Sequence, residues 1–108
     1  MIPGAMQPYS LTVDKFLDHA AKWHSRSQVV TATGAGDSTR TDYLALRAQA
    51  QRVSAALAER GAGQGDVVAT LAWNTQEHLE SWYGIMGMGA ICHTLNPRLL
   101  PTQLAAML

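Results

Sequence analysis

The sequence predicts an α/β fold in which helices flank a parallel or mixed sheet. Two observations carry this prediction. From Val67 onward, strand-like and helix-like segments alternate, which is typical of right-handed crossover units in a parallel sheet. The segment Val67–Ala72 is also apolar throughout except at Thr70, as in a strand that is covered on both faces. A chain of 108 residues is long enough for one small domain.

The first part of the chain predicts an extended lead-in over residues 1–10, then a helix and a hairpin. Residues 1–10 contain two prolines and no periodicity. The next segment, about Val13–His24, has apolar residues at helical spacing and predicts one buried stripe: Phe16, Leu17, Ala20 and Trp23. Two β-rich segments follow, with a Gly-rich turn between them, and predict strands over Gln28–Thr33 and Ser38–Thr41.

The clearest helix is predicted over Tyr43–Arg60. Apolar residues recur there at three- and four-residue steps and share one face: Tyr43, Leu46, Ala50, Val53 and Leu57. Thr41 or Asp42 can cap its start, and Gly61 can supply the left-handed residue at its end.

The second part of the chain predicts a strand, a helix, a strand and a final helix. The first strand is Val67–Ala72, and the helix covers about Thr75–Met86 with Asn74 as its cap and Glu77 completing a capping box. Ala90–Leu95 is the next strand. Pro101 can open a last helix that reaches Leu108.

Composition narrows the class of protein and of partner. Only 15% of the residues are charged, against roughly 25% in soluble domains, which indicates that part of the surface is normally covered. The net charge is zero and the arginines are scattered, so no basic patch indicates binding to nucleic acid or to an anionic membrane. No apolar run approaches the roughly 20 residues of a transmembrane helix, and the single Cys92 fits a reducing compartment. We therefore expect a cytoplasmic protein. If the chain is truncated, its exposed sheet edges and apolar helix faces should favour self-association, and we expect a homo-oligomer.

Most residues that could carry chemistry have a simpler structural interpretation. The segment Gly61–Asp66 follows a helix and precedes a strand, which is the wrong context for a phosphate-binding loop. His19 and His24 fall on different helix faces and make a poor metal pair. Cys92 fits a buried, inert thiol. Glu77 and Glu80 are explained as helix-start carboxylates. Trp73, Trp82 and Tyr83 are explained as core aromatics, and the alternative for them is that they line an acyl pocket.

His93 is the one residue retained as a candidate for a substrate cleft. It lies near the carboxyl end of a predicted parallel strand, and the active sites of open α/β sheets gather at that edge. The alternative for His93 is a hydrogen-bonded, partly buried structural histidine.

Several segments together resemble the AMP-forming acyl-CoA synthetases. The most specific groups are Ala72-Trp73-Asn74, His78-Leu79-Glu80 and the run from Cys92 to Leu99. Thr41–Leu46 and Gly65–Ala69 resemble the entry to the long helix and the strand after it. The resemblance covers about Leu11–Leu108 and is nearest to the medium- and long-chain fatty-acyl-CoA and methylthiopropionyl-CoA ligase branch.

The resemblance implies that residues 11–108 are the N-terminal portion of an adenylation domain, truncated at its C-terminus. The parent enzyme would use ATP, Mg²⁺ and CoA to activate a fatty or other small carboxylic acid as acyl-AMP and then as a thioester. The family's Ser/Thr/Gly-rich loop ending in Pro-Lys and its other catalytic motifs are absent from these residues. We therefore assign no catalytic residue and expect the chain alone to be inactive scaffold.

Two alternatives stay open. The chain can be a small, non-catalytic α/β interaction module, or a piece of another adenylate-forming enzyme, such as an aryl-CoA ligase or a fatty-acyl-AMP ligase. The apolar end, Leu104–Leu108, leads us to expect that the natural polypeptide continues.

Overall fold

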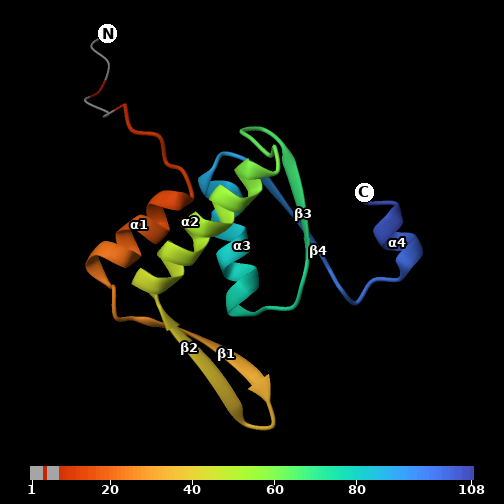
Figure 1. Ribbon diagram of the computed structural model, residues 1–108, viewed down its shortest axis with the longest axis horizontal. Coiled ribbons are helices and arrows are strands. Elements are labelled where there is room, and N and C mark those ends of the chain that lie inside the picture. Colours follow the sequence, from red (N-terminus) through yellow and green to blue (C-terminus); the bar gives the residue numbers. More distant parts are fainter. Residues whose placement is uncertain (1–3, 5–7) are drawn as a thin grey trace.

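The structure is a computed structural model that describes residues 4 and 8–108 (Figure 1). Most of the predicted lead-in over residues 1–10 lies outside the described residues. Eight elements follow in chain order, and they confirm the predicted alternation: α1 (Asp14–Trp23), β1 (Gln28–Gly34), β2 (Asp37–Asp42), α2 (Tyr43–Glu59), β3 (Val67–Leu71), α3 (Gln76–Gly87), β4 (Ile91–Leu95) and α4 (Pro101–Ala105).

The strands form two separate pairs. β1 and β2 make an antiparallel hairpin whose turn runs through positive φ values at Gly34, Ala35 and Gly36. β3 and β4 are parallel, paired from Val67 with Ile91 to Leu71 with Leu95. Helix α3 is the crossover between β3 and β4, as the alternating pattern predicted.

The core lies where α1, α2 and α3 meet. Leu17, Leu46 and Ala50 form its buried centre, and four partly buried side chains pack against them: Val29, Tyr43, Leu79 and Tyr83. The predicted apolar face of α2 is therefore correct at its first turns. Asp42 caps α2 by accepting a hydrogen bond from the backbone N–H of Ala45 at 2.7 Å.

Helices α2 and α3 approach each other unusually closely at Gly84. A Cβ atom placed on Gly84 would lie 2.7 Å from Cβ of Val53 and 2.8 Å from the carbonyl oxygen of Ala50. The hydroxyl of Ser54 donates a hydrogen bond across the same contact to the Gly84 carbonyl at 2.6 Å. Only glycine fits this position.

Three local predictions are wrong in detail. On α1 the buried residues are Leu17 and Ala21, because α1 turns that side toward α2 and leaves Phe16 and Trp23 in solvent. Thr75, one residue after the predicted Asn74, caps α3 by accepting a hydrogen bond from the N–H of His78. Helix α4 ends at Ala105 and does not reach Leu108.

Large apolar surfaces stay open to solvent. Val67, Leu71 and Ile91 lie on one face of the β3–β4 pair and are each more than half exposed. The Cα radius of gyration is 16.8 Å, against about 13 Å for a compact domain of this length. The low charge of the chain is thus matched by apolar surface that the described elements do not cover.

Gly84→Ala should destabilise the chain, because the new methyl group must push α2 and α3 apart. We expect a loss of about 1–3 kcal/mol in the free energy of unfolding, measured by urea denaturation. Gly87→Ala is the matched control. The nearest atom to its new Cβ is 3.9 Å away, so alanine's higher helix propensity should leave stability equal or slightly higher. Equal losses in both variants would contradict the close contact.

Cys92 should react as an unusually weakly acidic thiol. Burial raises the pKa of the Cys92 thiol by disfavouring its thiolate, and a hydrogen bond with Thr70 only partly opposes this shift. The thiolate is the reactive form, so the rate of alkylation by iodoacetamide increases with pH as the thiol ionises. The midpoint of this pH dependence should lie at a higher pH in the folded chain than in the urea-unfolded chain. Thr70→Val should move the midpoint of the folded chain higher still. Identical midpoints for folded and unfolded chains would refute this.

Candidate ligand cleft at the carboxyl edge of the parallel strands

The carboxyl ends of β3 and β4 lie side by side and lead into polar segments. β3 continues into Ala72-Trp73-Asn74 before α3 begins, and β4 continues into Asn96-Pro97-Arg98. Ligands of open α/β sheets bind outside the carboxyl ends of the strands. This edge is therefore where a site is expected from topology alone.

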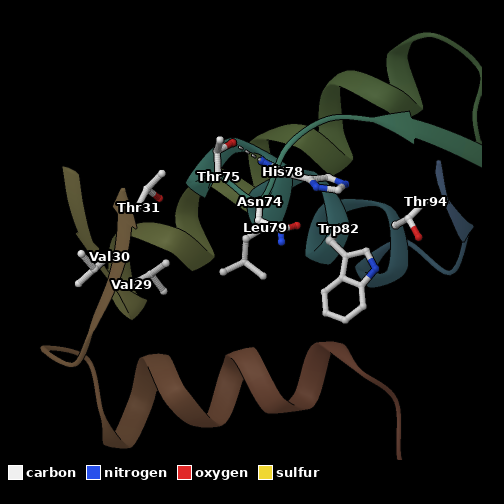
Figure 2. Close-up of a pocket in the computed structure, with 9 residues that line it drawn as sticks. All are labelled: Val29, Val30, Thr31, Asn74, Thr75, His78, Leu79, Trp82 and Thr94. Carbon is white, nitrogen blue, oxygen red and sulfur yellow. Dashed lines mark hydrogen bonds between the residues drawn. The ribbon is translucent and has the colours of Figure 1, made fainter. Parts of the chain in front are cut away.

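Two hollows occupy this edge and together form what we call the carboxyl-edge cleft. The first has a volume of about 480 Å³ and lies between α3 and the β1–β2 hairpin (Figure 2), lined by Val29, Val30, Thr31, Asn74, Thr75, His78, Leu79, Trp82 and Thr94. The second has a volume of about 430 Å³ and is lined by Ala72, Trp73, Asn74, His78, Thr94, Leu95, Asn96, Pro97 and Arg98. Asn74, His78 and Thr94 line both, so the hollows are adjacent.

His78 lies at the boundary between the two hollows and is held in place. Its Nε2 atom lies 3.0 Å from the hydroxyl oxygen of Thr70 on β3. The capping bond to Thr75 fixes the backbone of His78 at the first turn of α3. An imidazole that is anchored on one side and faces a cleft on the other can orient a polar ligand group.

The walls of the cleft are largely aromatic and aliphatic. Trp82 is 39% exposed and lines the first hollow, and Trp73 is 58% exposed and lines the second. The prediction that these two tryptophans are core is therefore wrong, because α3 and the segment after β3 turn them toward the cleft. Tyr83 does pack against the core, and burial there raises the pKa of its hydroxyl.

The polar groups of the cleft are cationic or neutral. The guanidinium carbon of Arg98 lies 5.4 Å from the centre of the Trp73 ring, within cation–π range. The backbone N–H of Arg98 donates a hydrogen bond to the side-chain Oδ1 of Asn96 at 3.0 Å, which shapes the turn after β4. Thr31 is only 8% exposed and still lines the first hollow. The cleft therefore combines apolar walls with a few fixed polar groups, as small-molecule sites do.

The two carboxylates lie at the start of α3, but Glu77 does not complete the predicted capping box, because Thr75 and not Asn74 caps the helix. The hydrogen bond from the backbone N–H of Glu77 and a second one from Thr75 lower the pKa of the Glu77 carboxyl. Glu80 instead accepts a hydrogen bond from the side chain of Gln76 at 2.7 Å. The two carboxylates therefore serve the start of α3, and neither lines the carboxyl-edge cleft.

His93, the residue retained from the sequence, lies beside the cleft without lining it. It sits on β4 opposite Ala69, next to the cleft residue Thr94, and successive side chains on a strand point to opposite faces. The Nε2 atom of His93 is buried and has no hydrogen-bond partner among the residues that the structure describes. Buried side-chain nitrogens normally form a hydrogen bond, so we expect a hydrogen-bond partner for this atom outside the described residues.

Sequence reasoning missed the contribution of the hairpin to the cleft. Val29 and Thr31 precede His78 by more than 45 residues and reach it only through the packing of β1 against α3. No local pattern signals such a contact. His78 and Thr94 lie in the segments that the resemblance singled out, but their spacing alone does not place them in one cleft.

The helices in the described part of the chain are all too short or too polar to cross a membrane. Over the same residues, no three His, Cys, Asp or Glu side chains are grouped so that they could hold a metal ion.

Comparison with known proteins assigns the family. The profile of the family described as "AMP-binding enzyme" matches residues 16–108. A 3-methylmercaptopropionyl-CoA ligase of Ruegeria lacuscaerulensis is 41% identical over 101 residues, which are 94% of this chain and 19% of the ligase. A long-chain-fatty-acid–CoA ligase of Thermus thermophilus is 40% identical over 106 residues, which are 98% of this chain and 20% of that protein.

The fold has a counterpart among solved structures. The anthranilate CoA ligase AuaEII, solved in complex with anthranoyl-AMP, superposes with a TM-score of 0.80 at 19% identity, over 94% of this chain and 19% of that one. The chain thus spans about a fifth of the length of the curated relatives that it matches. Since the family profile covers nearly all of the chain and these relatives are about 40% identical to it, the chain belongs to the AMP-binding enzyme family.

Proposed function

We propose that the chain is the N-terminal portion of the adenylation domain of an acyl-CoA ligase, and that it builds one wall of the substrate cleft. The observation that carries this proposal is the family match over residues 16–108, which contains the whole carboxyl-edge cleft. The chain spans about a fifth of its relatives, so the activity belongs to a larger assembly in which these residues serve as scaffold.

The reaction would proceed in two halves. The carboxylate of a fatty or other small acid attacks the α-phosphorus of ATP and forms acyl-AMP with release of pyrophosphate. The CoA thiolate then attacks the acyl carbon and releases AMP. Adenylation replaces a poor leaving group by a good one, and cationic groups offset the charge of the phosphates.

The carboxyl-edge cleft does not fit the metal ion. Mg²⁺ in nucleotide sites is bound by carboxylates and phosphate oxygens, and no carboxylate lines the carboxyl-edge cleft. We therefore place Mg²⁺ on parts of the enzyme other than this cleft. ATP and CoA belong there too in this proposal, because the family's Ser/Thr/Gly-rich phosphate loop is absent from these residues. The apolar walls and the single guanidinium of the cleft suit the carboxylic acid better.

In this proposal His93 finds its hydrogen-bond partner in the rest of the enzyme or in the substrate. Its buried Nε2 atom has no hydrogen-bond partner among residues 4 and 8–108, which supports a hydrogen bond to a group outside them, either the substrate or a neighbouring segment. We also propose a cytoplasmic location, which the single Cys92 supports. Without the rest of the enzyme to cover the apolar face of the β3–β4 pair, the isolated chain should form a homo-oligomer.

Reconstitution tests the ligase proposal directly. The chain alone should give no fatty-acid-dependent ATP–pyrophosphate exchange. Co-expression with the part of the Ruegeria ligase that follows the matched segment should raise exchange at least about a hundredfold over the background. Gly84→Leu should abolish this gain, because the bulky side chain separates α2 from α3.

Two outcomes would contradict this proposal. Exchange by the chain alone would refute the scaffold role. A folded mixture that associates and yet shows no exchange would favour the interaction-module alternative. In an active mixture, the acyl-substrate profile with and without CoA separates the fatty-acyl-CoA ligase from the aryl-CoA ligase and fatty-acyl-AMP ligase alternatives.

The two histidines should respond differently to replacement by phenylalanine. His78→Phe breaks the bond with Thr70 and should cost the isolated chain about 1–2 kcal/mol in unfolding free energy. His93→Phe removes an unpaired buried nitrogen and should leave the stability of the isolated chain equal or higher. In the reconstituted enzyme, however, His93→Phe should lower kcat/KM about tenfold. Unchanged kcat/KM in a folded His93→Phe enzyme would remove His93 from the cleft proposal.

A further inference from the structure

Helix α1 has a second apolar face, which does not contact the core. Phe16 and Trp23 are seven residues apart and so lie on the same side of the helix, 69% and 67% exposed. Val13 and Ala20 lie along the same side. A different side of the helix carries Leu17 and Ala21, which are buried. Figure 1 shows α1 at the margin of the helical group, beside α2.

The charges of α1 are sorted around this face. Both acidic residues point toward the body of the protein: Asp18 forms an ion pair with Arg47 of α2, and Asp14 has its Cβ 3.9 Å from where a side chain on Gly87 of α3 would begin. On the helix, Lys15 and Lys22 border the side that carries Phe16 and Trp23. The Nζ of Lys22 lies 5.1 Å from the centre of the Trp23 ring.

The segment before α1 adds two more exposed apolar side chains to this face. Tyr9 and Leu11 are both more than half exposed, and the Nζ of Lys15 lies 3.6 Å from the centre of the Tyr9 ring. The result is one surface with three aromatic rings, two lysines at its border and the carboxylates of α1 directed away from it. We call this surface, made of Tyr9, Leu11, Phe16 and Trp23 with Lys15 and Lys22, the α1 aromatic face.

We propose that the α1 aromatic face docks on the surface of a lipid bilayer that contains anionic lipids. Rings of this kind partition into the headgroup region, and lysines at the border extend along them and place their ammonium groups next to lipid phosphates. The helix has ten residues and so lies on the bilayer rather than across it. This inference does not depend on the ligase proposal, because no residue of the face lines the carboxyl-edge cleft.

The arrangement of charge favours a bilayer over a protein partner for this face. The open face of the β3–β4 pair is also apolar, with Val67, Leu71 and Ile91 exposed, but it has no lysine or arginine on these strands. A bilayer surface needs both components, apolar groups for insertion and cations at the border for the anionic headgroups. Of these two apolar faces, the α1 aromatic face has both.

Co-sedimentation with vesicles tests the proposal. The full 108-residue chain should sediment with vesicles of phosphatidylcholine and phosphatidylglycerol. The double variant Phe16→Ser/Trp23→Ser should lower the partition coefficient about tenfold, because two inserted rings are lost. The matched control is Leu71→Ser/Ile91→Ser, which removes two exposed apolar side chains from the sheet face and should leave the partition coefficient unchanged. Circular dichroism checks that each variant is folded.

Two further measurements locate the contact. Lys15→Glu/Lys22→Glu should weaken binding to the anionic vesicles more than binding to pure phosphatidylcholine. With Trp73→Phe and Trp82→Phe in place, Trp23 is the remaining tryptophan, and its emission should move to shorter wavelength when vesicles are added.

Three results would overturn the proposal. The wild-type chain could fail to sediment with vesicles. Both double variants could lose binding equally, which would indicate general stickiness. Light scattering could show that Phe16→Ser/Trp23→Ser converts an oligomer to a monomer with no change in vesicle binding, which would assign the face to a second copy of the chain.

Discussion

The close contact between α2 and α3 at Gly84 determines the position of everything that follows it in the chain. Val53 and the carbonyl of Ala50 fill the space that a side chain would need, and the Ser54 hydroxyl ties the Gly84 carbonyl to α2. Since α3 is the crossover between β3 and β4, its position fixes the parallel pair relative to the core. The carboxyl-edge cleft depends on the same contact, because α3 supplies His78, Leu79 and Trp82 to its wall.

Elements whose pattern is local were predictable from the sequence. The apolar face of α2 repeats over about four turns, and the apolar run of β3 needs no distant information, so both elements agree with the structure to within one residue at each end. The parallel pairing of β3 with β4 followed from the alternation of elements. Positions that depend on which side of an element meets the core were less secure. On α1, two apolar sides compete, and only the contact with α2 decides that Leu17 and Ala21 are buried.

The cleft could be placed only in outline. Topology predicts that a site gathers at the carboxyl edge of parallel strands, and His93 was selected on that ground. The structure instead brings His78 to the cleft, since the side chains of His93 and its neighbour Thr94 alternate across the sheet and Thr94 is the one that lines both hollows. The shift of the helix cap from Asn74 to Thr75 has a similar consequence. It leaves the side chain of Asn74 free to line the cleft.

The unusually low charge of the chain can be understood from where its few charges lie. Asp18 and Arg47 neutralise each other between α1 and α2, and Glu77 serves the start of α3. Away from these charges, the described part of the chain exposes two apolar surfaces that differ in character. The face of β3 and β4 is flat and has no cation on its strands, which suits further polypeptide of an α/β domain. The face of α1 is aromatic and bordered by lysines, which suits an interface between apolar and ionic media. The low charge of the chain therefore has two causes: one apolar face suits further polypeptide and the other suits a bilayer surface. The position of the lysines distinguishes these two faces.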